Sequence, residues 1–287
     1  MTVQQAYQKA LYSLSSLYEA SEAQAIVLRL FEPITGSQRL PAPGQMDLEL
    51  SVYHQLVLDK QLQELQTYKP LQYVLNEAWF MGHSFYVDPR VLIPRPETEE
   101  LVAWVLQDHP NVTGRAYKVL DIGTGSGCIA ISLQLARNYW EVSAIDISGE
   151  ALEVAAHNAQ ELGAMIKFDQ QDIFADPVTF PHPGYSLIIS NPPYIPSSLR
   201  GTLAPQVEGF EPVSALFVQS EDPLFFYHCI ARFGQVHLEP QGLVYVEAHH
   251  DGGADVAALL SKSGYIDVEI RKDMQGIERL VKGKWPG

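Results

Sequence analysis

The first part of the chain repeats apolar residues at the three- and four-residue spacing of a helix that buries one face. The tetrapeptide Ser21-Glu22-Ala23-Gln24 has the S-x-x-Q form of a capping box, so it predicts the start of a second helix. A third stretch, 48–65, again carries leucines at helical intervals. We therefore expect residues 1–75 to form a small helical domain. The first helix is predicted from Leu11, Leu14, Leu17 and Tyr18.

A different pattern follows the helical region. Two short aromatic and β-branched runs, Trp79-Phe80-Met81 and Phe85-Tyr86-Val87, flank a Gly-His pair and predict a β-hairpin. Two prolines farther along favour an extended path, and Thr98 or Glu97 is suited to start the next helix. We interpret residues 76–98 as a hairpin and a linker between two domains.

From Lys118 onward, short β-rich runs alternate with helical segments, at about 127–138 and along 152–162. Nearly unbroken apolar runs of this kind predict a mostly parallel sheet with helices on both faces, so we assign 99–287 to an α/β domain. Because only Lys272–Gly276 separate the last two runs, we expect an antiparallel hairpin at the end of the sheet. The strand candidates are 118–122, 142–146, 166–170, 186–190, 242–248, 265–270 and 277–282.

Composition narrows the possible classes of protein. The 287 residues are 46% hydrophobic, which is ample for a packed core, and their net charge is −15. Such an acidic chain disfavours sequence-blind binding to phosphate backbones or anionic membranes. Two cysteines, Cys128 and Cys229, suggest a reducing compartment, and neither a signal peptide nor a run of ~20 apolar residues is visible. We expect a cytoplasmic protein that binds neither nucleic acid nor membranes.

A glycine-rich turn, Gly123-Thr124-Gly125-Ser126-Gly127, lies between a predicted strand and a predicted helix. Glycine allows a ligand to approach the backbone closely, and ligands of open α/β sheets bind beyond the carboxyl ends of the strands. A dinucleotide site needs a glycine where this chain has Cys128, and a triphosphate site needs a G-K-[ST] sequence. The turn, which follows Asp121, therefore favours a ligand without phosphates, such as S-adenosylmethionine. A strand-to-helix turn without a ligand is the alternative.

Carboxylates follow the next two predicted strands. Asp146 ends the second strand, where it can accept hydrogen bonds from both ribose hydroxyls of a nucleoside. Its alternative role is to cap the helix after Ser148. Asp172 and Ile173 follow the third strand and could offer a carboxylate and backbone to an adenine ring, although a solvated turn explains them equally well.

The segment Asn191-Pro192-Pro193-Tyr194 ends a strand that is predicted to be buried. Consecutive prolines fix φ and remove two backbone donors, so the Asn191 side-chain oxygen and the Pro192 carbonyl can both accept from one planar NH2 group. Tyr194 offers a ring that can stack on this group. Two such acceptors would aim the nitrogen lone pair at an electrophilic methyl and stabilise the developing positive charge. The segment therefore predicts methyl transfer to a planar NH2, with a rigid turn as the alternative.

Several segments together resemble the bacterial release factor glutamine methyltransferases, which methylate N5 of the glutamine in the Gly-Gly-Gln motif of peptide chain release factors. Asn-Pro-Pro-Tyr alone is shared by many amino-methyltransferases, whereas the stretch Ile93–Glu99 is much more specific. The resemblance extends over nearly the whole chain. The matching segments are Pro70–Leu75, Val91–Glu99, Asp121–Gly127, Asn191–Pro196, Phe210–Pro212 with Ala215–Leu216, and Lys272–Arg279.

The resemblance implies a class I methyltransferase fold, a Rossmann-like seven-stranded sheet, together with a helical N-terminal domain that recognises the substrate. It also implies that S-adenosylmethionine is the cofactor, with its methionine moiety along Gly123–Gly127 and its ribose at Asp146. The adenine would lie near Asp172 and Ile173, and Asn191 would border the cofactor as well as the target.

The same resemblance places the target glutamine on Asn191, Pro192, Pro193 and Tyr194. Arg95 and Glu97 would close the pocket from the linker, although a surface salt bridge is an equal alternative for Arg95. Release factors are the expected protein partners, and we expect the chain to be a monomer.

Three segments depart from the family pattern. Asn76 stands in place of a glycine, Ser220-Glu221-Asp222-Pro223 replaces a glycine-rich turn, and Glu247-Ala248-His249-His250 replaces Glu-Ile-Gly. These changes bear on loop shape and partner docking and not on the chemistry of the pocket. His249-His250 raises the question of a metal, but the chemistry requires none, and we interpret the pair as a solvated turn.

Two other functions remain open from the sequence. An adenine-N6 methyltransferase acting on DNA or RNA also methylates a planar NH2, but capturing a base usually requires cations that follow phosphates. The net charge of −15 opposes this alternative. The other possibility is a regulatory module that binds the cofactor without catalysis.

Overall fold

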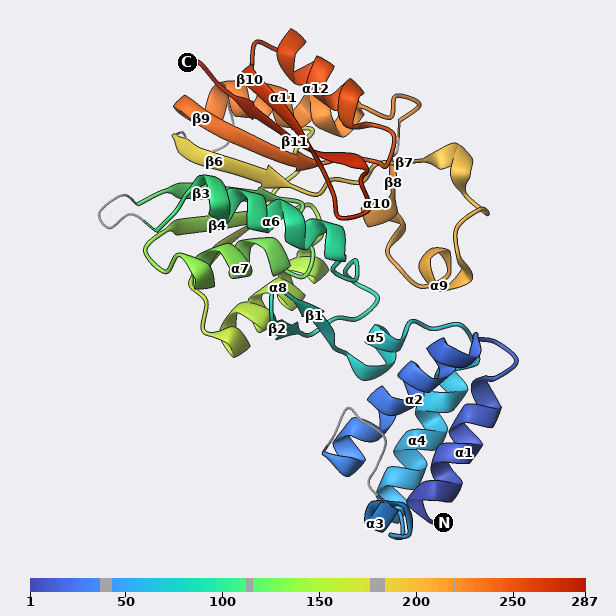
Figure 1. Ribbon diagram of the computed structural model, residues 1–287. Helices are drawn as coiled ribbons and strands as arrows, with labels where there is room; N and C mark the ends of the chain where they lie inside the picture. Colours follow the sequence, from blue (N-terminus) through green and yellow to red (C-terminus); the bar gives the residue numbers. More distant parts are fainter. Residues whose placement is uncertain (37–42, 112–115, 176–183, 219) are drawn as a thin grey trace. The chain divides into compact units, whose positions relative to one another are not determined.

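The computed structural model describes residues 1–36, 43–111, 116–175, 184–218 and 220–287, which form two compact units (Figure 1). Each unit has a hydrophobic core of its own. Within the described ranges, no helix has both the length and the apolar character that crossing a membrane requires. The smaller unit comprises Met1–Glu77 and Ala204–Phe210, and the larger comprises Ala78–Leu203 and Glu211–Gly287.

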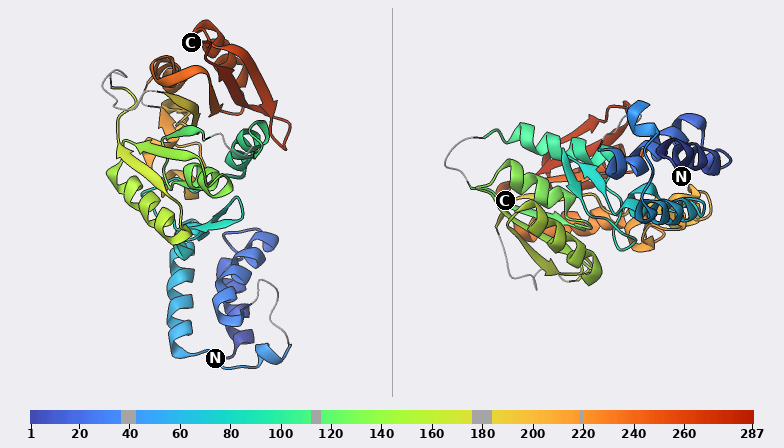
Figure 2. Two further views of the ribbon diagram at one scale, coloured as in Figure 1. Left: turned by 90° about the vertical axis from the view of Figure 1, so that its left-hand side faces the viewer. Right: turned by 90° about the horizontal axis from the view of Figure 1, so that it is seen from below.

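The smaller unit is a helical bundle, as the apolar spacing predicted (Figure 2). Its three long helices pack against one another and bury Leu14, Val27 and Leu65 completely. The long helices are α1 (Val3–Leu14), α2 (Ala20–Thr35) and α4 (Val52–Leu65), and the short ones are α3 (Pro43–Met46), α5 (Leu71–Leu75) and α9 (Pro205–Glu208).

The predicted capping box at 21–24 is wrong. With Ser21 as N-cap the helix would begin at Glu22, whereas α2 begins two residues earlier, and its N-cap, Glu19, makes no side-chain cap hydrogen bond. A reciprocal capping box does occur at the start of α1, where Thr2 accepts from the Gln5 amide and Gln5 accepts from the Thr2 amide. The S-x-x-Q sequence does not cap α2, because Ser21 is the second residue of the helix and not the residue before it.

Asn76, the departure from a family glycine, ends α5 in the left-handed conformation with φ +53°. Asparagine tolerates this region better than other residues that carry a Cβ atom. The turn therefore keeps the backbone geometry that a glycine would give it.

The larger unit contains a seven-stranded mixed sheet in the order β10-β11-β9-β6-β3-β4-β5, as expected for a class I methyltransferase. The five strands from β9 to β5 are parallel, and β11 runs antiparallel to both of its neighbours. The predicted terminal hairpin is thus confirmed. The strands are β3 (Lys118–Ile122), β4 (Glu141–Asp146), β5 (Ile166–Gln170), β6 (Tyr185–Ser190), β9 (Leu238–Glu247), β10 (Ile266–Lys272) and β11 (Glu278–Lys284).

Helices cover both faces of this sheet (Figure 1), so β6 is buried at every position. One face carries α6 (Pro96–Asp108), α7 (Cys128–Ala136) and α8 (Gly149–Leu162), and the other carries α11 (Phe225–His237) and α12 (Gly253–Lys262). Helix α6 starts at Pro96, not at the predicted Glu97 or Thr98. Proline is favoured at a first helical position because its missing N–H would have no helical partner.

Short elements complete the larger unit. The predicted hairpin is confirmed as β1 (Ala78–Phe80) paired with β2 (His83–Phe85). A small parallel pair, which the sequence did not predict, joins β7 (Ile195–Pro196) to β8 (Phe217–Val218) after the turn of helix α10 (Val213–Leu216). A 3-10 turn spans Ser197–Leu199.

The order of the parallel strands creates a crevice between β3 and β6. The chain runs from β3 outward to β4 and β5 and then returns to β6 on the other side of β3. The connections on the two sides of this switch point diverge, which leaves room for a ligand beyond the carboxyl ends of the strands. The glycine loop leaves β3 here, and Asn191 leaves β6.

Gly127 joins this loop to the packed helices. Its backbone is left-handed, with φ +82°. A Cβ atom on Gly127 would lie 2.9 Å from Ile131 Cδ1 and 3.1 Å from Ala155 Cβ. The third glycine of the loop is therefore required both for backbone conformation and for contact between α7 and α8.

We predict that Gly127→Ala lowers the free energy of unfolding more than Gly163→Ala does. Both glycines are left-handed, which costs an alanine about 1–2 kcal/mol, but a Cβ on Gly163 would meet nothing within 4 Å. The clash at Gly127 should add about 1–3 kcal/mol of overpacking. Urea unfolding of both variants measures the difference, and equal losses would contradict the packing role.

Candidate active site

A cleft of about 320 Å³ lies within the larger unit, at the carboxyl ends of the parallel strands. Residues from seven segments that are separate in the sequence meet there, and four of these segments carry predicted site residues. The predicted site residues that line it are Gly123, Gly125, Asp146, Asp172, Ile173, Asn191, Pro192 and Pro193. The topology therefore brings most of the predicted residues to one place.

The glycine loop presents bare backbone to the cleft. Gly123 and Gly125 have φ values of +72° and +55°, and a Cβ atom on either would meet nothing within 4 Å. The two residues between the glycines turn inward instead. Thr124 donates a 2.7 Å hydrogen bond to Asp121, and Ser126 is buried. Thr124, Ser126 and Gly127 thus hold the loop in shape without lining the cleft.

Asp146 ties the loop to strand β4. Its two carboxylate oxygens accept from the Gly125 and Ser148 amides, each at 2.9 Å. Asp146 is not the cap of α8, which was its alternative role. Ser148 Oγ caps this helix by accepting from the Ala151 amide. Burial raises the pKa of Asp146 above its ordinary value, although the backbone donors act in the opposite direction.

Asp172 and Ile173 form another part of the cleft wall after β5. Asp172 Oδ1 accepts from the Phe174 amide at 2.9 Å, and Ile173 is buried. The Phe174 ring lies 5.0 Å from Phe225 and 4.8 Å from Phe226, centroid to centroid. The wall therefore combines one carboxylate with apolar and aromatic surface.

Asn191 is held by a directional chain of hydrogen bonds. Its Nδ2 donates to Thr98 Oγ1 at 2.9 Å, and the Thr98 hydroxyl donates to Glu247 Oε2 at 2.7 Å. Thr98 and Glu247 are both buried. Because an ionised carboxylate can only accept, the hydroxyl must donate to it, and the hydroxyl oxygen must then accept from Asn191. This polarity leaves Asn191 Oδ1 available to a ligand.

The strand register explains why these groups meet. Ile122 of β3 pairs with Ser190 of β6, and Ser190 pairs in turn with Val246 of β9. The residues that follow, Asn191 and Glu247, are therefore neighbours at one edge. The Ser190 hydroxyl donates to the Ile122 carbonyl at 2.7 Å, which fixes the end of β6 beside the glycine loop.

Tyr194 lies behind the two prolines and does not line the cleft. Its hydroxyl donates to Glu247 Oε1 at 3.3 Å, so both carboxylate oxygens of Glu247 serve the Asn-Pro-Pro-Tyr segment. Burial and the adjacent Glu247 charge raise the pKa of Tyr194, which keeps its hydroxyl protonated as a donor.

Arg95 and Glu97 occupy positions beside the cleft, and neither lines it. Arg95 pairs with the buried Glu211 at 2.5 Å, so its partner is an interior carboxylate and not a surface one. Burial raises the pKa of Glu211 although Arg95 acts to lower it. Glu97 accepts from Gln275 Nε2 at 3.1 Å.

Two carboxyl groups under the cleft have strongly shifted pKa values. Burial raises the pKa of Glu247 to about 7, although the bond from Thr98 acts to lower it. Burial also raises the pKa of Asp121 to about 7, and the nearby Asp146 charge adds to the effect. Both groups thus titrate near neutral pH.

Comparison with known proteins identifies the family. The chain is 39% identical over 270 residues to the release factor glutamine methyltransferase of Bacteroides thetaiotaomicron, covering 94% of this chain and 95% of that protein. The chain belongs to the release factor glutamine methyltransferase family. The family member from Flavobacterium psychrophilum is 34% identical and covers 94% of both chains.

Other comparisons agree with this family and its fold. The family model of the methyltransferase small domain matches residues 100–201, which include the glycine loop and Asn191. A methyltransferase of Pyrococcus furiosus has a similar fold, with a TM-score of 0.52 and 17% identity, over 80% of this chain and 98% of that one. The resemblance predicted from the sequence is confirmed.

Three residues that hold the site in this member of the family were not among the predicted site residues. Thr98 was considered only as a helix start, although it lies in the specific Ile93–Glu99 segment. Glu247 gave a usable signal, since a lone charge ends the apolar run 243–246. Glu211 was noted only as part of a matching segment.

We predict that Thr98→Val lowers the rate of methyl transfer about 10- to 100-fold, because it leaves the Asn191 NH2 and Glu247 without their shared partner. Valine nearly matches threonine in shape but lacks the hydroxyl. Thr98→Ser keeps the hydroxyl and should retain most of the rate. Single-turnover assays test this, and equal rates for the two variants would contradict the proposed orientation of Asn191.

We predict that the free energy of unfolding of Glu247→Gln increases relative to that of the wild type as the pH rises from about 5 to about 8. With a folded pKa of about 7 against an ordinary 4.5, the folded chain binds more protons at Glu247 than the unfolded chain does. The contribution of Glu247 to the free energy of unfolding therefore falls as the pH rises through this window. Denaturant titrations across the range measure it, and parallel curves for the two proteins would refute the shift.

Proposed function

We propose that this chain transfers a methyl group from S-adenosylmethionine to the side-chain amide nitrogen (N5) of the glutamine in the Gly-Gly-Gln motif of peptide chain release factors. The orientation of Asn191 carries the proposal. Its NH2 is bound to Thr98, so its carbonyl oxygen is the group left for a substrate NH2 at the cleft. Family membership supports the same reaction and the same kind of substrate.

The residues of the cleft fit S-adenosylmethionine, which supplies an electrophilic methyl group on a sulfonium centre. The loop Gly123-Thr124-Gly125-Ser126-Gly127 suits a methionine moiety without phosphates, because it presents the open backbone of Gly123 and Gly125 to the cleft. A carboxylate has about four lone-pair sites, so Asp146, with two backbone donors, retains two for ribose hydroxyls. Asp172 and Ile173 would border the adenine.

The Asn-Pro-Pro-Tyr segment would bind and orient the target amide. The carbonyl oxygens of Asn191 and Pro192 would accept hydrogen bonds from the two N–H groups of the glutamine, and Tyr194 would hold the segment in place through its bond to Glu247 instead of stacking on the amide. Hydrogen bonds from both N–H groups favour a pyramidal nitrogen and direct its lone pair toward the methyl group of the cofactor. It also stabilises the positive charge that develops on the nitrogen, with acceptors that are already in place. Alignment of the two substrates can contribute roughly 7–11 kcal/mol to lowering the barrier.

Arg95 and Glu97 would close the target pocket through the segments that they hold together. Arg95 and the Ile93 amide both bind Glu211. Val91 and Leu92 on one side and Pro212 on the other line the cleft. Loss of the Arg95–Glu211 pair would thus loosen two walls of the cleft at once. Glu97 would hold the linker through the hydrogen bond that it accepts from Gln275.

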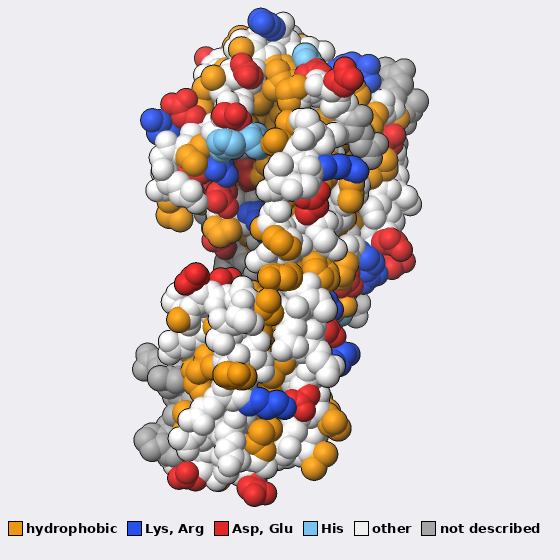
Figure 3. All heavy atoms as spheres, turned by 90° about the vertical axis from the view of Figure 1, so that its right-hand side faces the viewer, with side chains coloured by type: hydrophobic (Ala, Val, Ile, Leu, Met, Phe, Trp, Pro, Cys, Tyr) orange, Lys and Arg blue, Asp and Glu red, His pale blue; other side chains and the backbone are white. Residues whose placement is uncertain are grey.

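The remaining assignments concern the whole chain. Residues 1–75 would recognise the release factor, 76–98 would connect the parts, and 99–287 would carry catalysis. One chain supplies every group that the mechanism uses, which supports a monomer. A cytoplasmic location follows from the substrate, because release factors act on ribosomes. On the face drawn in Figure 3, Lys and Arg side chains lie scattered among acidic ones, unlike a track for phosphates.

We predict that Asn191→Ala lowers turnover about 10²–10³-fold, comparable to removing one preorganised contact to a developing charge. The affinity for S-adenosylmethionine should change far less. Asn138→Ala is the matched control, because Asn138 is exposed and precedes β4, at the amino end of the parallel strands and so opposite the cleft. Turnover with labelled cofactor and calorimetric cofactor binding measure the two effects. Near-normal turnover in Asn191→Ala would contradict the proposed hydrogen bond between Asn191 and the target amide.

The substrate is tested with the wild-type enzyme. A release factor should gain one methyl group on its Gly-Gly-Gln glutamine, and a release factor in which that glutamine is replaced should gain none. Mass spectrometry of the two proteins locates the modification. Equal labelling of both would refute the assignment, and methylation of duplex DNA would favour the adenine-N6 alternative.

A further inference from the structure

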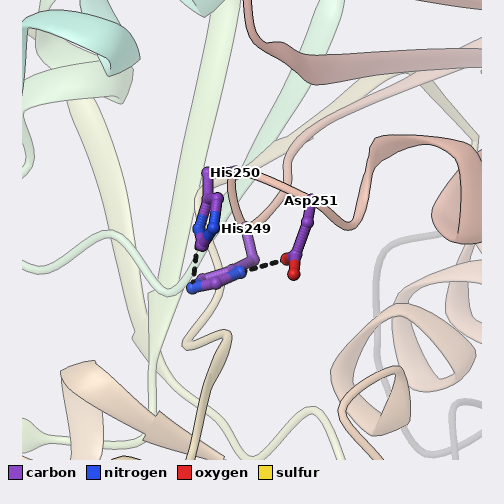
Figure 4. A group of neighbouring side chains, drawn as sticks. All are labelled: His249, His250 and Asp251. Carbon is purple, nitrogen blue, oxygen red and sulfur yellow. Dashed lines mark hydrogen bonds and ion pairs between the residues drawn. The ribbon is translucent and has the colours of Figure 1, made fainter.

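Two consecutive histidines and an aspartate form a compact cluster in the turn between β9 and α12. His249, His250 and Asp251 each offer one potential ligand atom, and these atoms lie within 4.8 Å of one another (Figure 4). We propose that this turn is a binding site for a divalent transition-metal ion of the zinc or nickel class. The sequence alone favoured a solvated turn, and the arrangement of the two rings is what changes this interpretation.

The spacing of the two rings fits ligands of a single ion. His249 Nε2 and His250 Nδ1 lie 3.2 Å apart. Two imidazole nitrogens that are each about 2.0–2.1 Å from one zinc ion stand roughly 2.8–3.4 Å apart, for ligand angles between octahedral and tetrahedral. The separation of the two nitrogens therefore matches one shared ion, and binding requires the rings to turn so that both lone pairs point at that ion.

Asp251 fixes the tautomer that binding requires. His249 Nδ1 is in hydrogen-bond contact with Asp251 Oδ1. A charged carboxylate accepts the Nδ1 proton, so the Nε2 lone pair of His249 faces His250. Metal-binding histidines commonly carry such a carboxylate on the other ring nitrogen.

Binding of an ion would replace the hydrogen bond between His250 Nδ1 and His249 Nε2. Without an ion, His250 Nδ1 can donate its proton to the lone pair on His249 Nε2. With an ion between the two nitrogens, neutral His250 would carry its proton on Nε2 and present the Nδ1 lone pair. No proton is gained or lost, and the remaining coordination positions are open to water. Imidazole ligands favour zinc, nickel or copper over magnesium or calcium.

The cluster lies beside the target-binding segment. The His249 ring stands 5.7 Å from the Tyr194 ring in an edge-on contact. Figure 3 shows histidine side chains gathered at the surface of the larger unit, where an ion has access from solvent. His250 and Asp251 are both exposed. An ion here would be an exchangeable one, held at the border of the site.

Isothermal titration of Zn²⁺ into the full-length chain tests the site, with neither cofactor nor release factor present. We expect one ion per chain. His249→Ala and His250→Ala should each weaken binding at least about tenfold, and Asp251→Asn should weaken it about 10-fold through loss of the orienting carboxylate. His228→Ala is the matched control, because His228 is also exposed and lies beside a carboxylate, with Nε2 3.8 Å from Asp222. It should bind normally.

Two results would overturn the proposal. One is the absence of Zn²⁺ binding by the wild-type chain. The other is binding that persists unchanged in the His249→Ala/His250→Ala double variant, which would place the ion elsewhere. Thermal unfolding of each variant establishes that the fold is retained. Since no methyl transfer is measured, failure of this proposal and failure of the proposed reaction are distinguishable.

Discussion

The hydrogen bond from the Thr98 hydroxyl to Glu247 sets which end of the Asn191 side chain is free at the cleft. A primary amide such as Asn191 can present either its oxygen or its nitrogen, and the two are nearly equal in shape. When it is ionised, the buried carboxylate removes this ambiguity because it can then only accept. Without it, the corner after β6 would be a rigid turn with no preference between donors and acceptors.

This arrangement has an energetic consequence within the fold. Glu247 is fully buried and its pKa is about 7, so its charged form is disfavoured there. Two donors, Thr98 and Tyr194, offset part of the loss of hydration. Asp121 is in a similar position under the glycine loop. The buried carboxyl groups at the base of the cleft therefore lower the stability of the fold, in exchange for hydrogen-bond directions that are fixed before a ligand binds. The packed helices and strands around them supply the remaining stability.

Much of the fold could be predicted from sequence, since local patterns determined it. Apolar periodicity located the long helices, although Leu17 and Tyr18 lie beyond the end of α1 at Leu14. Short β-rich runs located all seven strands of the main sheet, and the runs are most apolar in the central parallel strands, which are covered on both faces. Contacts between residues that are far apart in the chain could not be predicted from the sequence. Thr98 appeared to belong to a helix start, yet its hydroxyl bonds to a residue 149 positions away.

The family and its reaction were also predictable, because motifs record chemistry that does not depend on exact packing. The side chains that hold those motifs were less so. The Arg95–Glu211 pair joins residues 116 positions apart, and only the tertiary structure shows that Glu211 is buried and Arg95 is its partner. His249-His250 is a further case, since two adjacent histidines imply nothing until the ring positions are known.

The most direct test of the central claim is a crystal structure of the enzyme with S-adenosylhomocysteine and a Gly-Gly-Gln peptide. The account predicts that the glutamine side-chain nitrogen lies within hydrogen-bond distance of both Asn191 Oδ1 and the Pro192 carbonyl oxygen, with the Asn191 NH2 still on Thr98. A complex in which the Asn191 NH2 faces the glutamine, or in which the glutamine nitrogen lies away from this corner, would contradict it.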